Sequence, residues 1–140
     1  MKYLLDTCVL SEMIRLNPNA SVIKWISSCN EDQLFISVLT LGEIQKGISK
    51  LSNIKRKDVL QHWLDNDLTE RFDGRILPIT RETALTWGEV LGEAEAKGRT
   101  LPSIDGLIGA TAIAHNLTVV TRNEKDLTFS GVKLLNPWTI

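Results

Sequence analysis

Three acidic residues of this sequence could do chemistry together. Asp6, Glu43 and Asp105 each have mostly apolar neighbours, whereas most of the other acids have polar ones. An ionised carboxylate in apolar surroundings is costly unless it is paired, hydrogen-bonded or bound to a metal. Three carboxylates without histidine or cysteine favour a hard cation such as Mg²⁺ or Mn²⁺. Because such ions activate water and polarise phosphodiesters, these residues predict metal-dependent phosphoryl chemistry.

A fourth acidic ligand is expected in the polar segment that follows the apolar run ending at Val120. Asp126 is the first choice in this segment, Asn123 is the second and Glu124 is the third. The alternative is an ordinary polar loop, and this alternative is strongest for Glu124.

Each of the three acids also has a purely structural interpretation. Asp6 is suited to cap the N-terminus of a helix. The segment Thr40–Glu43 matches a capping box, in which Glu43 bonds back to the first residue of the box. Asp105 lies in a first helical turn after Ser103, where the helix dipole favours a carboxylate. One common site accounts for all three acids more simply than three unrelated caps do.

Hydrophobic periodicity predicts alternating strands and helices around these acids. Strands are expected at Tyr3–Leu5, Leu34–Val38, Arg75–Ile79, Leu117–Val120 and Val132–Leu135. Helices are expected at Cys8–Arg15, from Val22 to about Asn30, from Thr40 to about Leu51, at Lys57–Arg71, from Ala84 to about Gly98, and at Ile104–His115. Pro78 indicates that its strand is an edge strand or ends there.

Strands that alternate with helices indicate an α/β sandwich with a mostly parallel sheet. In such sheets, ligands bind beyond the carboxyl ends of the strands. Asp6, Glu43 and Asp105 all fall where a strand has ended and a helix is beginning. The fold is therefore expected to bring the three carboxylates to one edge of the sheet.

The length of 140 residues is typical of one domain, here residues 1–140. Sixteen basic and 17 acidic residues give a net charge of −1, which argues against a simple nucleic-acid coat protein but not against a nucleic-acid enzyme. Cys8 and Cys29 form no disulfide or zinc pattern. The early Asp6 argues against a signal peptide, and no apolar run approaches the roughly 20 residues that span a bilayer. We therefore expect a cytoplasmic protein without membrane contact.

Basic residues are candidates for contacts to a phosphate-containing substrate. Arg99 and Arg122 are the first choices, because they lie closest in sequence to the expected site loops. A run without acids also contains Lys46, Lys50, Lys55, Arg56 and Lys57. This run either binds RNA phosphates or is a solvated helix end and loop, which is the favoured interpretation.

Taken together and in order, these motifs resemble the PIN-domain family, in particular the VapC-type toxins of bacterial toxin–antitoxin pairs. The matching pieces are Leu4–Thr7 with Val9–Glu12, Ser37–Ile44 with Gly47–Ile48, Asp105–Ala112, and Val120–Asn123 with Asp126. The ending Leu135–Trp138 is similar to the FitB-like branch of that family.

The resemblance implies a PIN-like three-layer sandwich with a five-stranded parallel sheet, and a Mg²⁺-dependent endoribonuclease that hydrolyses RNA. Asp6, Glu43 and Asp105 match the acidic positions of the family. Asn123 stands where many relatives carry Asp, so Asp126 is expected to substitute from the same loop. Thr7 either orients a metal-bound water or serves as a helix-capping hydroxyl.

The resemblance also implies partners. A VapB-type antitoxin from the same operon would bind operator DNA with its amino-terminal half and block the toxin site with its tail. Operator DNA would be bound only through this antitoxin, and the chain itself is expected to form a homodimer within the toxin–antitoxin assembly.

Two other functions compete with this interpretation. One is a receiver-like or other phosphate-binding domain, but a receiver would carry a second acid near Asp6, and none occurs before Glu12. The other is a non-catalytic or weakly catalytic interaction protein that acts with its antitoxin in a DNA-binding regulatory complex. Asn123 leaves room for this second alternative.

Overall fold

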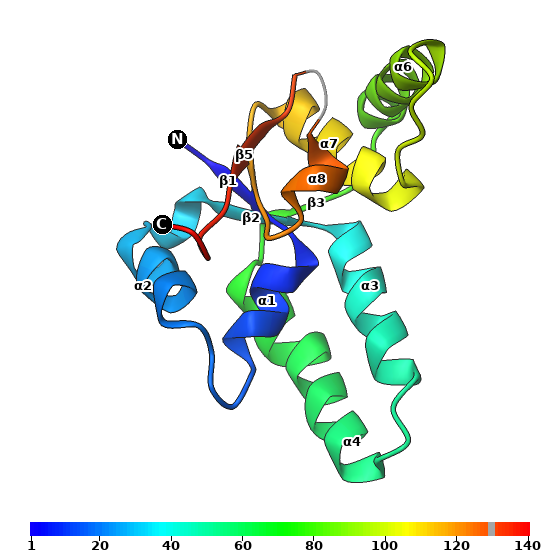
Figure 1. Ribbon diagram of the computed structural model, residues 1–140. Coiled ribbons are helices and arrows are strands. Elements are labelled where there is room, and N and C mark those ends of the chain that lie inside the picture. Colours follow the sequence, from blue (N-terminus) through cyan, green and yellow to red (C-terminus); the bar gives the residue numbers. More distant parts are fainter. Residues whose placement is uncertain (129–130) are drawn as a thin grey trace.

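Five parallel strands form the centre of the fold (Figure 1). The computed structural model describes residues 1–128 and 131–140. The strands are β1 (Tyr3–Leu5), β2 (Leu34–Ser37), β3 (Ile76–Leu77), β4 (Thr118–Val120) and β5 (Lys133–Leu135). They are arranged in the order β3-β2-β1-β4-β5, and each neighbouring pair is parallel. The predicted α/β fold with a five-stranded sheet is confirmed, and Pro78 follows directly after the edge strand β3.

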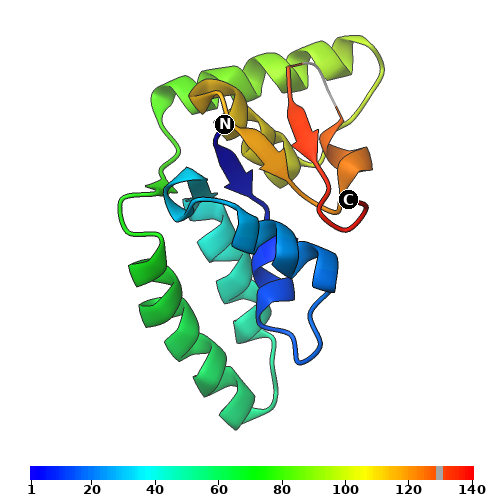
Figure 2. The same ribbon diagram turned by 90° about the vertical axis from the view of Figure 1, so that its left-hand side faces the viewer.

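Helices connect the strands and cover both faces of the sheet. The α-helices are α1 (Thr7–Met13), α2 (Ala20–Ser28), α3 (Val38–Ser49), α4 (Ile54–His62), α5 (Thr69–Arg71), α6 (Arg81–Ala96), α7 (Ser103–His115) and α8 (Glu124–Leu127). A 3₁₀ turn, η1 (Glu31–Gln33), precedes β2, and a π-helical segment, η2 (Trp63–Leu68), joins α4 to α5. Figure 2 shows α6 and α7 on one side of the sheet and the helices α1 to α4 on the other.

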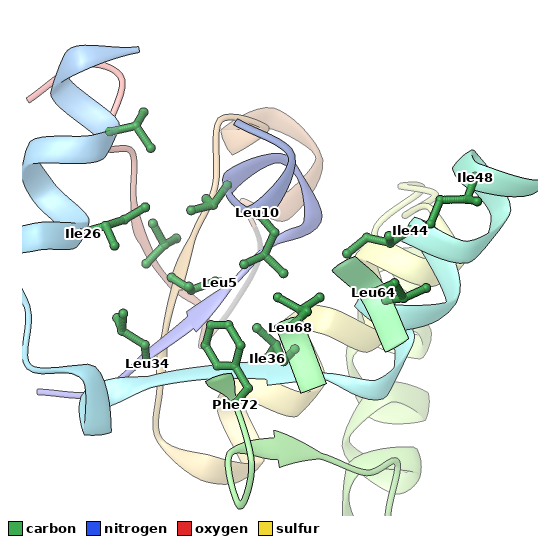
Figure 3. Packing of buried hydrophobic residues seen from close by; sticks show 13 residues of the cluster. Leu5, Leu10, Ile26, Leu34, Ile36, Ile44, Ile48, Leu64, Leu68 and Phe72 are labelled. Carbon is green, nitrogen blue, oxygen red and sulfur yellow. The ribbon is translucent and has the colours of Figure 1, made fainter. Parts of the chain in front are cut away.

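Side chains of β1 alternate between two hydrophobic cores, as expected for a strand buried on both faces. Leu5 packs with residues of α1–α3 and with Phe72, which is fully buried (Figure 3). Leu4 points the other way and packs with Ile108 of α7 and with Val119. Because both cores hold β1 in place, the residue that follows it, Asp6, has a fixed position at the end of the strand.

The start of α3 differs from the prediction. The helix begins at Val38 rather than Thr40, and the Ser37 side chain caps it by accepting a hydrogen bond from the Leu39 amide (3.1 Å). Thr40 is fully buried within the helix, and its hydroxyl has no hydrogen-bond partner among the described residues. The capping-box interpretation of Glu43 is therefore wrong, because Glu43 lies in the second turn of the helix and not three residues after its cap.

Other helices also depart from the prediction, and α6 begins at Arg81 rather than Ala84. The helix expected at Lys57–Arg71 begins earlier, at Ile54, where Asn53 caps it, and it passes through the π-helical segment η2 before it ends at Arg71. The four-residue helix α8 was expected to be loop. Within the part of the chain that the structure describes, no helix is long and apolar enough to cross a bilayer.

Candidate active site

Asp6 lies at the point where the chain order of the sheet reverses, between β1 and β4. It is 8% exposed, and both carboxylate oxygens are hydrogen-bonded: Oδ1 accepts from the Thr7 amide (2.9 Å) and Oδ2 from the Thr121 hydroxyl (2.8 Å). The Cys8 thiol makes a longer contact with Oδ2 (3.8 Å). Ligands bind at such switch points of parallel sheets. Asp6 caps α1, and the same carboxylate is held at the expected binding edge.

Glu43 is brought to this edge by α3, the helix that follows β2. Its Oε1 accepts a hydrogen bond from the Thr7 hydroxyl, with an oxygen–oxygen distance of 2.7 Å. Thr7 is the first residue of α1 and directly follows Asp6. This hydrogen bond joins α1, which follows β1, to α3, which follows β2. It fixes the orientation of the Glu43 carboxylate relative to Asp6.

Asp105 is positioned by the packing of α7 against α6. Gly106 is buried, and a Cβ atom there would lie only 3.3 Å from Nε1 of Trp87, so glycine lets the two helices approach closely. The same Nε1 donates a hydrogen bond to the Ser103 carbonyl (3.3 Å) at the start of α7. Asp105 is half-buried in the first turn of this helix.

The charges of the predicted acids act on one another. Burial raises the pKa of Asp105 from 3.8 to about 6, and the negative charges of Asp6, Asp126 and Glu43 add to this effect in that order. A carboxyl group surrounded by other carboxylates resists ionisation because like charges repel. The structure thus gathers all four predicted acids closely enough for their charges to interact.

The three candidates in the loop after β4 have different surroundings. Asp126 lies on α8, is exposed, and its charge acts on Asp105. Asn123 stands at the start of α8, and its backbone amide donates to the Thr121 hydroxyl (2.9 Å). Glu124 accepts a hydrogen bond from the Asn136 side chain (3.3 Å). Asp126 remains the candidate for the fourth acidic ligand.

Two residues of the site are absent from the sequence-based prediction. Thr121 orients Asp6 from the end of β4, and Cys8 contacts both of these residues. Burial, followed by the charge of Asp6, raises the pKa of the Cys8 thiol, so the group is protonated and able to donate at neutral pH. The signals for Thr121 were its place directly after a buried strand and its position within the matching piece Val120–Asn123.

The donor set fits a hard divalent cation. All four acids offer carboxylate oxygens, and their mutual repulsion around Asp105 is relieved by a positive charge. Among the described residues, no three acidic, cysteine or histidine side chains form a ready-made chelating group. Mg²⁺ commonly keeps several waters and is held through one or two carboxylates, a mode that needs no closed cage.

Removing the hydroxyl of Thr7 tests its positioning of Glu43. Thr7→Val keeps the shape of the side chain but removes the donor to Oε1, and we expect Mg²⁺ affinity to fall about tenfold, the lower end of the range for residues that orient metal ligands. Thr7→Ser keeps the donor and is expected to bind as the parent protein does. Calorimetric titration with Mg²⁺ measures the difference, and equal affinities for the valine and serine variants would contradict this role.

The two arginines expected to contact substrate have partners within the chain. The guanidinium of Arg99 donates to the Thr128 carbonyl (3.1 Å), which connects the loop between α6 and α7 to the residue that follows α8. The guanidinium of Arg122 lies over the ring of Trp138 at 5.4 Å from its centre. Both side chains belong to exposed residues near the site loops. Their role as substrate contacts remains a prediction.

Comparisons with known proteins match this chain along nearly its whole length. Residues 3–132 match the family described as PIN domain. Toxin FitB of Neisseria gonorrhoeae is 36% identical over 135 residues, which are 96% of this chain and 97% of the relative. VapC ribonuclease Y4jK of Sinorhizobium fredii is 30% identical over 134 residues, with 96% of each chain covered.

Solved structures agree with these sequence matches. The crystal structure of FitAcB from Neisseria gonorrhoeae superposes with a TM-score of 0.93 at 36% identity and covers 99% of both chains. The structure of VapBC2 from Rickettsia felis, bound to a DNA fragment from its promoter, superposes with a TM-score of 0.80 at 27% identity and covers 97% of this chain and 98% of the other.

Proposed function

Because the chain belongs to the PIN domain family, we propose that it is a metal-dependent endoribonuclease and the toxin of a type II toxin–antitoxin pair. The observation that carries the proposal is the grouping of Asp6, Glu43 and Asp126 near Asp105 at the carboxyl edge of the sheet, where burial and then their charges raise the pKa of Asp105. The names of the relatives FitB and Y4jK, a toxin and a ribonuclease, support the same function.

The four acids have distinct roles in this proposal. Asp6, Glu43 and Asp105 hold Mg²⁺, or Mn²⁺ in its place, and Asp126 completes the ligand set from α8, with Asn123 as the alternative from the same loop. When bound, the ion supplies an activated water and neutralises charge on the scissile phosphate and the leaving oxygen. The site carries out hydrolysis of an RNA phosphodiester.

Two threonines position these acids. Thr121 donates to Asp6 and Thr7 donates to Glu43, so each carboxylate keeps one fixed orientation before substrate arrives. Preorganised ligands avoid reorganisation during the reaction. Arg99 and Arg122 lie near the site loops and are proposed to contact the phosphates of the substrate.

The partner in this proposal is a VapB-type antitoxin, and the toxin is a homodimer within the assembly. The FitAcB and promoter-bound VapBC2 structures support it, because chains of this fold occur there together with partner proteins. Operator DNA reaches this chain through the antitoxin. Action on cellular RNA places the proposed activity in the cytoplasm.

Cleavage of RNA by the purified protein tests the proposal. We expect cleavage of a mixed cellular RNA sample in Mg²⁺, complete loss with EDTA and recovery when Mg²⁺ is restored. Co-expression with the product of the neighbouring reading frame is expected to suppress cleavage. A folded protein that leaves RNA intact in both Mg²⁺ and Mn²⁺ would overturn the ribonuclease assignment and favour the interaction-protein alternative.

A further inference from the structure

A groove of about 660 Å³ leads away from the candidate active site along α3. Thr7 and Glu43 line it midway along α3, and Ile104, the neighbour of Asp105, forms part of its wall. Lys46 and Lys50 line it farther along the helix. The groove therefore includes the Glu43 carboxylate and reaches the neighbour of Asp105, and its part toward the end of α3 carries positive charge.

The two lysines are available to an external anion. They are four residues apart, so they lie on the same face of α3 with Cβ atoms about 5–6 Å apart. Both are exposed, and neither forms an ion pair within residues 1–128 and 131–140. Lysines near a helix C-terminus also interact favourably with the helix dipole, but this interaction alone would not require the lysines to line a groove.

Two glycines in the same helix leave the groove open. Gly42 and Gly47 line it, and a Cβ atom at either position would meet no heavy atom within 4 Å. Packing within the chain therefore does not require glycine there. Glycine within a helix is destabilising relative to alanine. What the two glycines provide is free space beside α3, next to the lysines.

The rest of the wall is apolar. Val38, at the start of α3, is 38% exposed, and Ile104, next to Asp105, is 40% exposed. The described lining residues include no aromatic side chain on which a base would stack. Contacts to phosphate should therefore dominate binding, and such contacts are sensitive to salt and indifferent to sequence.

We propose that the α3 groove binds the single RNA strand that continues from the scissile phosphodiester, with Lys46 and Lys50 contacting successive phosphates. This inference rests on the proposed ribonuclease function. The strand places one phosphate among the acids, where a cation is needed to receive it, and the adjoining phosphates beside the lysines. Lys46 and Lys50 are therefore substrate-binding residues in addition to Arg99 and Arg122. A charge-complementary peptide is the competing occupant.

Fluorescence anisotropy with a short single-stranded RNA in EDTA tests the groove without metal-dependent cleavage. For Lys46→Ala/Lys50→Ala we expect about tenfold weaker binding. The slope of log affinity against log salt should fall by about 1.4, or 0.7 for each lost phosphate contact. Lys46→Arg/Lys50→Arg should keep the parent affinity. The matched control Lys55→Ala/Lys57→Ala removes two lysines of α4 that do not line the groove, and it should change affinity less than twofold.

Two results would overturn the groove as the RNA path. If Lys46→Ala/Lys50→Ala leaves the RNA affinity and the salt slope unchanged, the competing occupant of the groove, a charge-complementary peptide, is favoured instead. An equal loss in both alanine pairs would assign binding to a diffuse basic region. Failure of the ribonuclease proposal is seen separately, as intact RNA when the parent protein is given Mg²⁺, and the binding comparison still decides the role of the groove.

Discussion

Asp105→Asn should lower the rate of Mg²⁺-dependent RNA cleavage by about a thousandfold. The substitution removes one negative charge from the group formed with Asp6, Glu43 and Asp126. Metal-assisted charge stabilisation is worth several kcal/mol, and each 1.36 kcal/mol corresponds to a tenfold change in rate. Asp6→Asn should have a similar effect, because its amide oxygen still accepts from the Thr7 amide but the carboxylate charge is lost.

A loss of folding would not explain this result. Asparagine is nearly isosteric with aspartate, and removing the repelled charge of Asp105 should leave the metal-free protein at least as resistant to heat as the parent. Glu93→Gln, which removes an exposed acid of α6, is the matched control and should cleave RNA normally. Cleavage at the parent rate by either Asp105→Asn or Asp6→Asn would contradict the assignment of the site.

Mg²⁺ affinity should fall steeply as the pH decreases below about 6. The pKa of Asp105 is about 6 in the folded protein, and a ligand must lose its proton before it binds metal. For one competing proton, the apparent affinity falls about tenfold per pH unit below that value, or roughly thirtyfold between pH 7.5 and pH 4.5. Calorimetric titration across this range measures the loss.

In the metal-free protein, the titration of Asp105 acts on stability in the opposite direction: the free energy of unfolding should fall as the pH rises. The folded state holds the Asp105 proton more tightly than the unfolded chain, so the stabilising contribution is complete below pH 3.8 and is lost as the pH rises through about 6. Bound Mg²⁺ should therefore raise the midpoint of unfolding more at pH 7.5 than at pH 4.5. A shift of equal size at both pH values, or one unchanged in Asp105→Asn, would contradict this linkage.

The sequence was most informative about the acids at the strand ends. Asp6 directly follows the buried strand β1, as predicted. The prediction that Asp105 also follows a strand is wrong, because α6 precedes α7, and the packing of α7 on α6 positions Asp105 instead. The same reasoning predicted that Glu43 lies at the carboxyl edge of the sheet, but it wrongly assigned Glu43 to a capping box. Ser37 and Thr40 are both acceptable helix caps by type and both are fully buried, but the backbone is already helical from Val38, so Ser37 is the cap.

Contacts between distant segments were beyond local patterns. Thr121 and Asp6 are 115 residues apart, and the hydrogen bond between them depends on β1 pairing with β4. Thr7 was expected to orient water or cap a helix, yet its hydroxyl bonds to Glu43 on another helix. The π-helical segment η2 also left no signature in the hydrophobic spacing, because its Leu64 and Leu68 are spaced as in an α-helix.

The scattering of the acids along the chain has a consequence for protein synthesis. Asp126 is translated 120 residues after Asp6, and the strand β5 that completes the sheet is translated after both. An unfinished chain or a fragment broken in the middle lacks part of the ligand set. A cell making the proposed toxin is therefore exposed to its activity only after both Asp126 and β5 have been translated.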